Sequence, residues 1–221
     1  MCEDVSRGLH RRPAESDGSY RFSNASPAHT HAYVLPTVIR LLDRIEWPAD
    51  SRRVFDLGCG NGATAAQLST LGYEVVGVDP SEDGVRIANA TYPHIRIHQG
   101  SAYDDLASTH GRFQALVSLE VIEHVFFPRK FAACVYSLLE QGGTAIISTP
   151  YHGYWKNLAL ALSGKLDAHF TALWECGHIK FWSRKTLTRL LHEVGLQVID
   201  VIRVGRIPVF AKSMIVVAQR L

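Results

Sequence analysis

Two glutamates and a histidine interrupt an apolar run in SLEVIEHVFFP, residues 118–128. In a helical turn, Glu120, Glu123 and His124 stand at i, i+3 and i+4, so their side chains share one face. Carboxylates and an imidazole can hold a divalent ion, and an imidazole with a pKa of about 6.5 can accept a proton. The same spacing also fits a solvated helix end. The pattern therefore leaves a metal site, a proton acceptor or a polar surface open.

The donor types in this stretch point to two different kinds of metal. Two carboxylates suit a hard ion such as Mg²⁺, whereas an imidazole suits zinc or iron better. We keep Glu120, Glu123 and His124 as a candidate metal site and His124 as a candidate base.

A glycine-rich stretch, FDLGCGNG, places Gly58, Gly60 and Gly62 where an apolar strand should pass into a helix. Glycine permits a tight turn and lets a ligand approach the backbone, and a helix N-terminus offers free N–H groups. By itself, such a stretch is also an ordinary strand-to-helix turn.

Two acids near this loop narrow the choice of ligand. Asp79 ends the next apolar run, YEVVGVD, where nucleotide-binding folds place a carboxylate on the ribose hydroxyls. Asp56 lies just before the first glycine, and a carboxylate there repels a pyrophosphate but attracts an ammonium group. The G-x-G-x-G spacing also differs from the G-x-G-x-x-G of dinucleotide sites. A nucleoside that carries an amino acid, such as S-adenosylmethionine, fits better than NAD.

Five features follow one another along the chain: FDLGCGNG, GVDPS, EVIEH, the glycine pair at 142–143 and the two closing apolar runs. In this order the sequence resembles the class I S-adenosylmethionine-dependent methyltransferases from about residue 54 onward. EVIEHV before a proline-started helix is similar to the ubiquinone-biosynthesis O-methyltransferases. The resemblance implies S-adenosylmethionine as cofactor and O-methylation of a small aromatic or lipophilic molecule, with His124 as candidate base. An N-methyltransferase, a non-catalytic S-adenosylmethionine-binding protein and a nicotinamide-dependent oxidoreductase are the alternatives.

The same resemblance implies a set of cofactor-binding residues around the glycine loop and at the strand ends: Asp56, Gly58, Cys59, Gly60, Asp79, Pro80, Ser101, Ala102, Leu119 and Glu120. The ubiquinone enzymes are described as binding Mg²⁺ through two glutamates and a histidine, which corresponds to Glu120, Glu123 and His124 here. They also place an arginine from the N-terminal region on the cofactor, and Arg21 is the counterpart without a motif to mark it.

Aromatic residues crowd the segment that follows the fifth predicted strand, where this fold builds its acceptor pocket. Rigid apolar walls with a polar edge suit a planar or lipophilic acceptor. We expect Tyr151, His152, Tyr154 and Trp155 to contact the substrate, although any single one could equally belong to the packing of the segment. His152 and His178 are alternative bases.

These motifs require a scaffold in which strands and helices alternate. Apolar periodicity predicts helices at 29–45, 62–72, 81–92, 128–141 and 183–195, and strands at 52–58, 73–79, 95–101, 113–121, 144–150, 196–210 and 213–221. We therefore predict an α/β fold with a Rossmann-like seven-stranded mixed sheet, mostly parallel with a C-terminal antiparallel hairpin, and helices on both faces. Gly142 and Gly143 should end the helix at 128–141.

The chain divides into a short leader and one larger unit. Residues 1–27 lack periodicity and predict a flexible leader, and residues 28–221 predict a single methyltransferase domain. A lid insertion on the acceptor side should occupy about 151–182, with the apolar stretch 158–164 as a buried lid helix.

Composition bounds the remaining function classes. A net charge of +2 with 47% hydrophobic and 20% charged residues indicates a globular protein, and no basic stripe favours nucleic acid. The four cysteines stand apart, which predicts reduced thiols, and no apolar run approaches the ~20 residues of a transmembrane segment. We expect a cytoplasmic protein with a small-molecule acceptor, and the sequence does not determine the oligomeric state.

Overall fold

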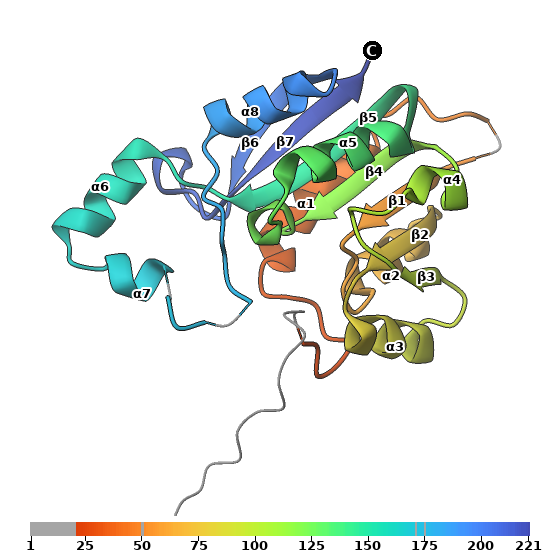
Figure 1. The fold of residues 1–221 in the computed structure, drawn as a ribbon, viewed down its shortest axis with the longest axis horizontal. Coiled ribbons are helices and arrows are strands. Elements are labelled where there is room, and N and C mark those ends of the chain that lie inside the picture. Colours follow the sequence, from red (N-terminus) through yellow and green to blue (C-terminus); the bar gives the residue numbers. More distant parts are fainter. Residues whose placement is uncertain (1–20, 50, 171, 175) are drawn as a thin grey trace, which may run out of the picture.

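The computed structural model describes residues 21–49, 51–170, 172–174 and 176–221. Seven strands form one sheet in the order β3-β2-β1-β4-β5-β7-β6 (Figure 1). The strands are β1 (Arg53–Leu57), β2 (Glu74–Asp79), β3 (Arg96–Gln99), β4 (Phe113–Leu119), β5 (Leu139–Pro150), β6 (Leu196–Val204) and β7 (Ser213–Arg220). The first five pair in parallel, whereas β7 pairs antiparallel with both β5 and β6. The predicted mixed sheet is confirmed.

Six helices cover the two faces of this sheet. Residues of α1 (His31–Leu42), α2 (Ala63–Thr70) and α3 (Glu82–Thr91) share one hydrophobic cluster with the strands. A second cluster, on the opposite face, takes its residues from α4 (Leu106–His110), α5 (Pro128–Leu138) and α8 (Arg184–Glu193). The inner side chains are fully buried, with Leu68 on one face and Phe131 on the other. Burial of both sheet faces explains why the parallel strands read as continuous apolar runs.

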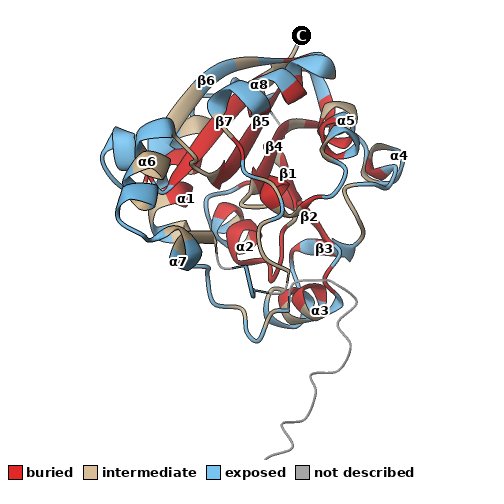
Figure 2. Cartoon of the chain, turned by 60° about the vertical axis from the view of Figure 1, so that its left-hand side comes forward, coloured by how far each residue is buried: buried red, intermediate tan, exposed pale blue. Residues whose placement is uncertain are grey.

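Two further helices extend away from the sheet and form what we call the arm, residues 153–170 (Figure 1). The arm contains α6 (Tyr154–Leu162) and α7 (Leu166–Phe170), and none of the residues in either helix is buried. Figure 2 shows this contrast between the buried sheet and the exposed arm. The prediction of a buried helix at 158–164 was therefore wrong: α6 packs against α7 and the short 3₁₀ helix η2 (Pro208–Phe210), and none of its residues is buried.

The end of α5 also differs from the prediction. The helix stops at Leu138 and β5 begins at Leu139, so Gly142 and Gly143 lie within the strand rather than at the helix end. The guanidinium of Arg220, which comes from β7, donates hydrogen bonds to the carbonyls of Tyr136 (3.2 Å) and Leu139 (2.7 Å). A distant side chain therefore takes the carbonyl-capping role that the sequence assigned to glycine.

Most of the predicted leader, residues 1–20, lies outside the described residues. The described remainder of the leader is hydrogen-bonded to the glycine loop. The Asn61 side chain donates to the carbonyls of Asn24 (2.8 Å) and Ser26 (2.9 Å). The boundary at residue 27 stays a prediction. No helix in the described part of the chain has the length and apolar character needed to cross a lipid bilayer.

Candidate active site

A cavity of about 1460 Å³ lies along the carboxyl ends of the parallel strands. Ligands of open α/β sheets bind at this edge, and single-ligand pockets are usually about 300–1,000 Å³. The cavity therefore has room for two ligands. We call one part the glycine-loop end (Gly58, Cys59, Gly60, Asp79 and Ser101) and the other part the arm end (His124, Lys156, Phe170, His178 and Arg206).

Backbone geometry explains the glycines of the loop. Gly58 and Gly60 have φ angles of 83° and 54°, in the left-handed region that glycine adopts at little cost. A Cβ atom on Gly58 would overlap the side chain of Val121, and one on Gly60 would overlap the ring of Phe22. The Gly58 amide donates to the carbonyl of Val78 at 2.8 Å, which ties the loop to β2. The loop is thus fixed between β2, the turn after β4 and the N-terminal segment.

Asp79 orients the glycine loop through its carboxylate. One oxygen accepts from the amide of Gly60 and the other from the amide of Ser81, each at 2.8 Å. Burial raises the pKa of Asp79, and these two amide bonds act in the opposite direction. Each carboxylate oxygen can accept more than one hydrogen bond, so both keep acceptor capacity for ligand hydroxyls. Asp79 lines the cavity, as the sequence predicts.

Asp56 differs from the prediction, because it does not line the cavity. Its residue is only 1% exposed, and its Oδ2 has no hydrogen-bond partner. Burial, with the nearby charge of Asp79, raises the pKa of Asp56 to about 8. At neutral pH the group is then largely an uncharged acid beneath the loop, which is poorly suited to attract an ammonium group directly.

The other predicted cofactor residues lie at the cavity surface. The lining includes Gly58, Cys59, Gly60, Asp79, Pro80, Ser101, Ala102, Leu119 and Glu120. Burial raises the pKa of the Cys59 thiol well above its ordinary value, and the charges of Asp56 and Asp79 add to the effect. Asp104 is absent from the lining and instead accepts a hydrogen bond from the amide of Ser101 at 2.7 Å.

Tyr103 links the loop after β3 to the segment after EVIEH. Its hydroxyl accepts hydrogen bonds from the amides of Phe126 (2.9 Å) and Phe127 (3.2 Å). Tyr103 and Phe126 both line the cavity, although the sequence analysis singled out neither.

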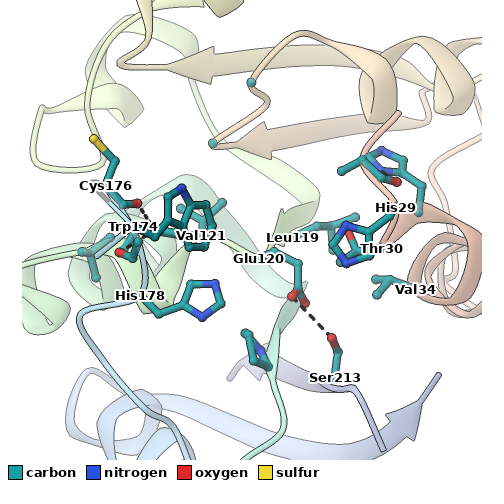
Figure 3. A pocket seen from close by; sticks show the side chains of 18 of the residues that line it. His29, Thr30, Val34, Leu119, Glu120, Val121, Trp174, Cys176, His178 and Ser213 are labelled. Carbon is teal, nitrogen blue, oxygen red and sulfur yellow. Dashed lines mark hydrogen bonds between the residues drawn. The ribbon is translucent and has the colours of Figure 1, made fainter. Parts of the chain in front are cut away.

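The EVIEH stretch does not form a single helical face. Glu120 has a φ of 58°, and the 3₁₀ helix η1 covers only Ile122–His124. The Glu120 carboxylate accepts hydrogen bonds from the hydroxyls of Ser148 (2.8 Å) and Ser213 (3.3 Å), as Figure 3 shows for Ser213. The left-handed turn therefore sends Glu120 toward β5 and β7.

Glu123 and His124 instead form a cluster with His178. One ligand atom from each of the three lies within 4.8 Å of the other two. Glu123 is 1% exposed and neither of its carboxyl oxygens has a hydrogen-bond partner, while Nε2 of His178 lies 3.9 Å from Oε1. His178 thus takes the place that the sequence analysis gave to Glu120 in the candidate metal site.

Backbone contacts bring His178 to this cluster across more than 50 residues of sequence. The amides of Ile179 and Lys180 both donate to the carbonyl of Glu123 at 2.9 Å, and the indole of Trp182 donates to the carbonyl of Ile122 at 3.1 Å. The sequence carries no signal for this pairing, although it did mark His178 as an alternative base.

The tautomer of His124 follows from its hydrogen bonds. Its Nδ1 lies 3.0 Å from the carbonyl oxygen of Cys176 and 3.2 Å from that of Gly177. Carbonyl oxygens only accept, so Nδ1 carries the proton and Nε2 of the neutral ring keeps its lone pair. Such second hydrogen bonds also orient imidazoles that bind metals.

The pKa shifts in the cluster favour uncharged groups. Burial lowers the pKa of His124, and burial with the nearby His124 lowers the pKa of His178 to about 4. Burial, and then the charge of Glu120, raises the pKa of Glu123 well above its ordinary value. The neutral imidazoles keep a free lone pair for a metal ion or for an acceptor proton, the lowered pKa makes each a weaker base, and a metal would displace the Glu123 proton.

The predicted substrate residues lie outside the cavity lining. Tyr154 and Trp155 are 74% and 63% exposed on α6, while the His152 ring packs against Phe170 and Phe181. Burial lowers the pKa of His152 to about 4. The helical turn of α6 presents Lys156, Ala159, Leu160 and Ser163 to the cavity, and substrate contact by Tyr151, His152, Tyr154 and Trp155 stays a prediction.

The N-terminal segment supplies a wall that the sequence analysis left largely unassigned. Arg21 and Tyr33 line the cavity, together with residues between them. Figure 3 shows His29 and Thr30 on one side of the cavity, with Trp174 and His178 on the other. The cavity is therefore enclosed by segments far apart in the chain.

The family model described as "Methyltransferase domain" matches residues 28–201. A ubiquinone biosynthesis O-methyltransferase of Bartonella quintana is 30% identical over 169 residues, which cover 73% of this chain and 67% of that protein. The protein of the same name from Bradyrhizobium diazoefficiens is 34% identical over 114 residues, which cover 51% of this chain and 45% of that protein. The chain thus spans about half to two-thirds of the length of these relatives.

Solved structures share the fold at low sequence identity. A magnesium protoporphyrin IX methyltransferase from Synechocystis PCC 6803, with bound SAH, superposes with a TM-score of 0.62 at 19% identity, covering 85% of this chain and 82% of that one. A geranyl diphosphate C-methyltransferase from Streptomyces coelicolor A3(2) gives a TM-score of 0.61 at 15% identity, covering 85% and 79%.

Proposed function

The chain belongs to the methyltransferase family whose model it matches, and we propose that it O-methylates a small aromatic or lipophilic molecule with His124 as the base. The family membership makes it an S-adenosylmethionine-dependent methyltransferase. The acceptor class and the role of His124 go beyond that membership.

The observation that carries the proposal is that one cavity joins the glycine-loop end to a neutral, oriented histidine. Methyl transfer is an in-line displacement at a sulfonium, so positioning the acceptor oxygen about 3 Å from the methyl carbon supplies most of the catalysis. A phenolic or catecholic hydroxyl must also lose its proton. The unprotonated Nε2 of His124 can take that proton as the new bond forms.

We assign cofactor binding to the residues of the glycine-loop end. The Asp79 carboxylate would accept hydrogen bonds from the ribose hydroxyls, and the backbone of Gly58 and Gly60 would lie against the methionine part. Ser101 and Ala102 would flank the adenine, with Leu119 and Glu120 beside them. Asp56 would act beneath the loop rather than as a direct contact.

The arm supports the predicted lid, since it contributes Lys156, Leu160 and Phe170 to the lining. We propose that residues 28–221 form one domain in which about 151–182 closes over the acceptor. Exposure of both arm helices is consistent with a segment that packs against a ligand rather than against the core.

A divalent ion is the finer alternative for the same cluster. The buried, unpartnered carboxyl of Glu123 and the two neutral imidazoles fit such an ion, and two nitrogen donors with one oxygen suit zinc or iron better than Mg²⁺. When bound, the ion would act as a Lewis acid toward the acceptor oxygen. Glu123, His124 and His178 would hold the ion. Glu120 would keep its hydrogen bonds from Ser148 and Ser213.

The test is release of S-adenosylhomocysteine from S-adenosylmethionine across catechols, phenols and amines, each with added metal and with excess chelator. We expect turnover of a catechol or phenol. Turnover of amines alone would contradict O-methylation. Undiminished turnover in chelator would exclude the metal and leave His124 as base, whereas loss restored by one divalent ion would identify the cluster as a metal site.

A further inference from the structure

Basic side chains gather at the arm end of the cavity. Lys156 comes from α6, Arg206 from the connection between β6 and β7, and both line the cavity. In the part of the chain that the structure describes, neither forms an ion pair with a carboxylate, and Arg206 makes no hydrogen bond. Two cations from separate elements, half-buried Lys156 and exposed Arg206, therefore line one cavity without a paired carboxylate.

The position of the Lys156 ammonium group is fixed by its neighbours. Its Nζ donates to the carbonyl of Tyr151 at 2.8 Å, which leaves two donors for another partner. Burial and the charge of Arg206 lower the pKa of Lys156, whereas Glu120 raises it. Like charges near each other in a partly desolvated space are costly until an anion compensates them.

The surroundings supply one carboxylate, that of Glu120, for the two cations. The acids that line the cavity in the described residues are Asp79 and Glu120. Asp79 is bonded to the backbone at the glycine-loop end, and the Glu120 carboxylate accepts from Ser148 and Ser213. His169, also in the lining, has a pKa lowered by burial and by the charge of Lys156. The arm end is thus positive and open to a ligand.

The walls beside these cations are apolar. Leu160 and Phe170 of the arm and Phe210 of η2 line the same end, and α6 packs against η2. A ligand that satisfies both features has an apolar or aromatic body and a negatively charged group.

We propose that Lys156 and Arg206 bind an anionic group of the methyl acceptor, a carboxylate or a phosphate, while the acceptor's apolar body lies against Leu160, Phe170 and Phe210. The proposal rests on the proposed function, because it names the class of molecule that the same site methylates. An anion held at one edge orients the ring and carries the reacting hydroxyl toward His124, so the cations act in positioning and specificity.

Direct binding tests the site without relying on turnover. The whole protein, saturated with S-adenosylhomocysteine, is titrated with 3,4-dihydroxybenzoate, with its methyl ester, and with phenyl phosphate. We expect Lys156→Gln and Arg206→Gln each to weaken binding of the favoured anion by about 10- to 100-fold, as loss of a charge-assisted hydrogen bond does. Binding of the ester should change less than about twofold. Whichever of carboxylate and phosphate binds more tightly identifies the charged group.

Controls separate a binding role from a structural one. Lys165→Gln removes an exposed charge between α6 and α7 of the same arm and should leave all three affinities unchanged. Lys156→Arg keeps the charge and should retain most of the affinity. S-adenosylhomocysteine affinity should stay within about twofold in every variant, and an equal loss of it would place these cations on the cofactor and overturn the proposal.

The outcome for this site is distinguishable from that of the proposed function. Equal binding of acid and ester, unaffected by either variant, would overturn the anion site even if phenols are methylated. Conversely, Lys156-dependent anion binding in a protein that methylates only amines would support the anion site and contradict O-methylation.

Discussion

The two ends of the cavity are formed by different kinds of groups, backbone amides at one end and side chains at the other. At the glycine-loop end, buried backbone amides and one carboxylate hold each other in place at the ends of the parallel strands. At the arm end, side chains from exposed helices and loops line the space, and no residue of α6 or α7 is buried. The first end is part of the folding core, whereas the second is attached to it.

The two ends differ in how readily their residues can be substituted without loss of stability. A loop made of backbone amides and left-handed glycines is costly to change, because each substitution meets the core or the neighbouring segment. An exposed arm can change residues with little effect on stability. We therefore expect the common ligand to be set by the sheet and the acceptor to be set by the arm.

The largest effect should come from His124, the candidate base at the arm end. Replacing it by alanine should lower kcat by about 10²- to 10⁴-fold, since the acceptor proton loses its base. Affinity for S-adenosylhomocysteine should change less than about threefold, as measured by calorimetry beside the rate assay. His94→Ala, at an exposed position, is the matched control. An equal loss of turnover and cofactor affinity would show that His124 holds the two ends together rather than handling a proton.

Asp79→Ala should produce the next largest effect, confined to the glycine-loop end. The change removes the acceptor of the Gly60 and Ser81 amides and the expected ribose contact. We expect S-adenosylhomocysteine to bind about 10- to 100-fold more weakly. Glu82→Ala, at an exposed acid in the first turn of α3, should bind normally. Unchanged affinity in the Asp79 variant would contradict its role in the cofactor site.

Asp56→Asn should change how stability depends on pH. The pKa of Asp56 in the folded protein is about 8, above the unfolded value of about 3.9. Its contribution is complete below the unfolded pKa and is lost as the pH rises through the folded pKa. Between pH 6 and pH 9, the unliganded wild type should lose about 2 kcal/mol more unfolding free energy than Asp56→Asn.

Urea unfolding at pH 6, 7.5 and 9 measures this difference. Glu140→Gln, at an exposed position on β5, should follow the wild type at every pH. Parallel pH curves for wild type and Asp56→Asn would mean that Asp56 is ionised throughout, and the glycine-loop end would then hold a buried charge.

The smallest effect should come from the arm. Leu162 is 81% exposed at the end of α6, so Leu162→Ser should change the free energy of unfolding by less than about 0.5 kcal/mol. Leu68→Ala, in the core beneath α2, should cost about 2–5 kcal/mol in the same chemical denaturation. A comparable loss at Leu162 would show that the arm is part of the folding core and would remove the distinction between the two ends.

Local patterns predicted the glycine-loop end well. The loop glycines directly follow β1 and Asp79 ends β2, so periodicity and turn chemistry were enough to place each of them at a strand end. Helix caps are local in the same sense. The side chains of Ser81 and Ser183 cap α3 and α8, and each accepts a hydrogen bond from the amide three residues later.

Long-range contacts explain what the sequence did not reveal. His178 reaches His124 through backbone bonds to Glu123, and Arg206 of the β6–β7 connection lines the same cavity as Lys156 and lowers its pKa. Neither pairing has a characteristic spacing. The aromatic residues predicted to contact the substrate lie outside the cavity lining, because residue type alone does not say which side of an exposed helix faces the cavity.

The thiol of Cys59 has a chemical consequence for a site that holds a sulfonium. S-adenosylmethionine is an alkylating agent, and a thiolate is among the best nucleophiles that a protein can offer. Burial and two neighbouring acids raise the pKa of Cys59, so its thiol, which packs in the core beside Gly77, stays protonated. A protonated thiol reacts slowly, which spares the protein from alkylating itself while a methyl donor waits for its acceptor.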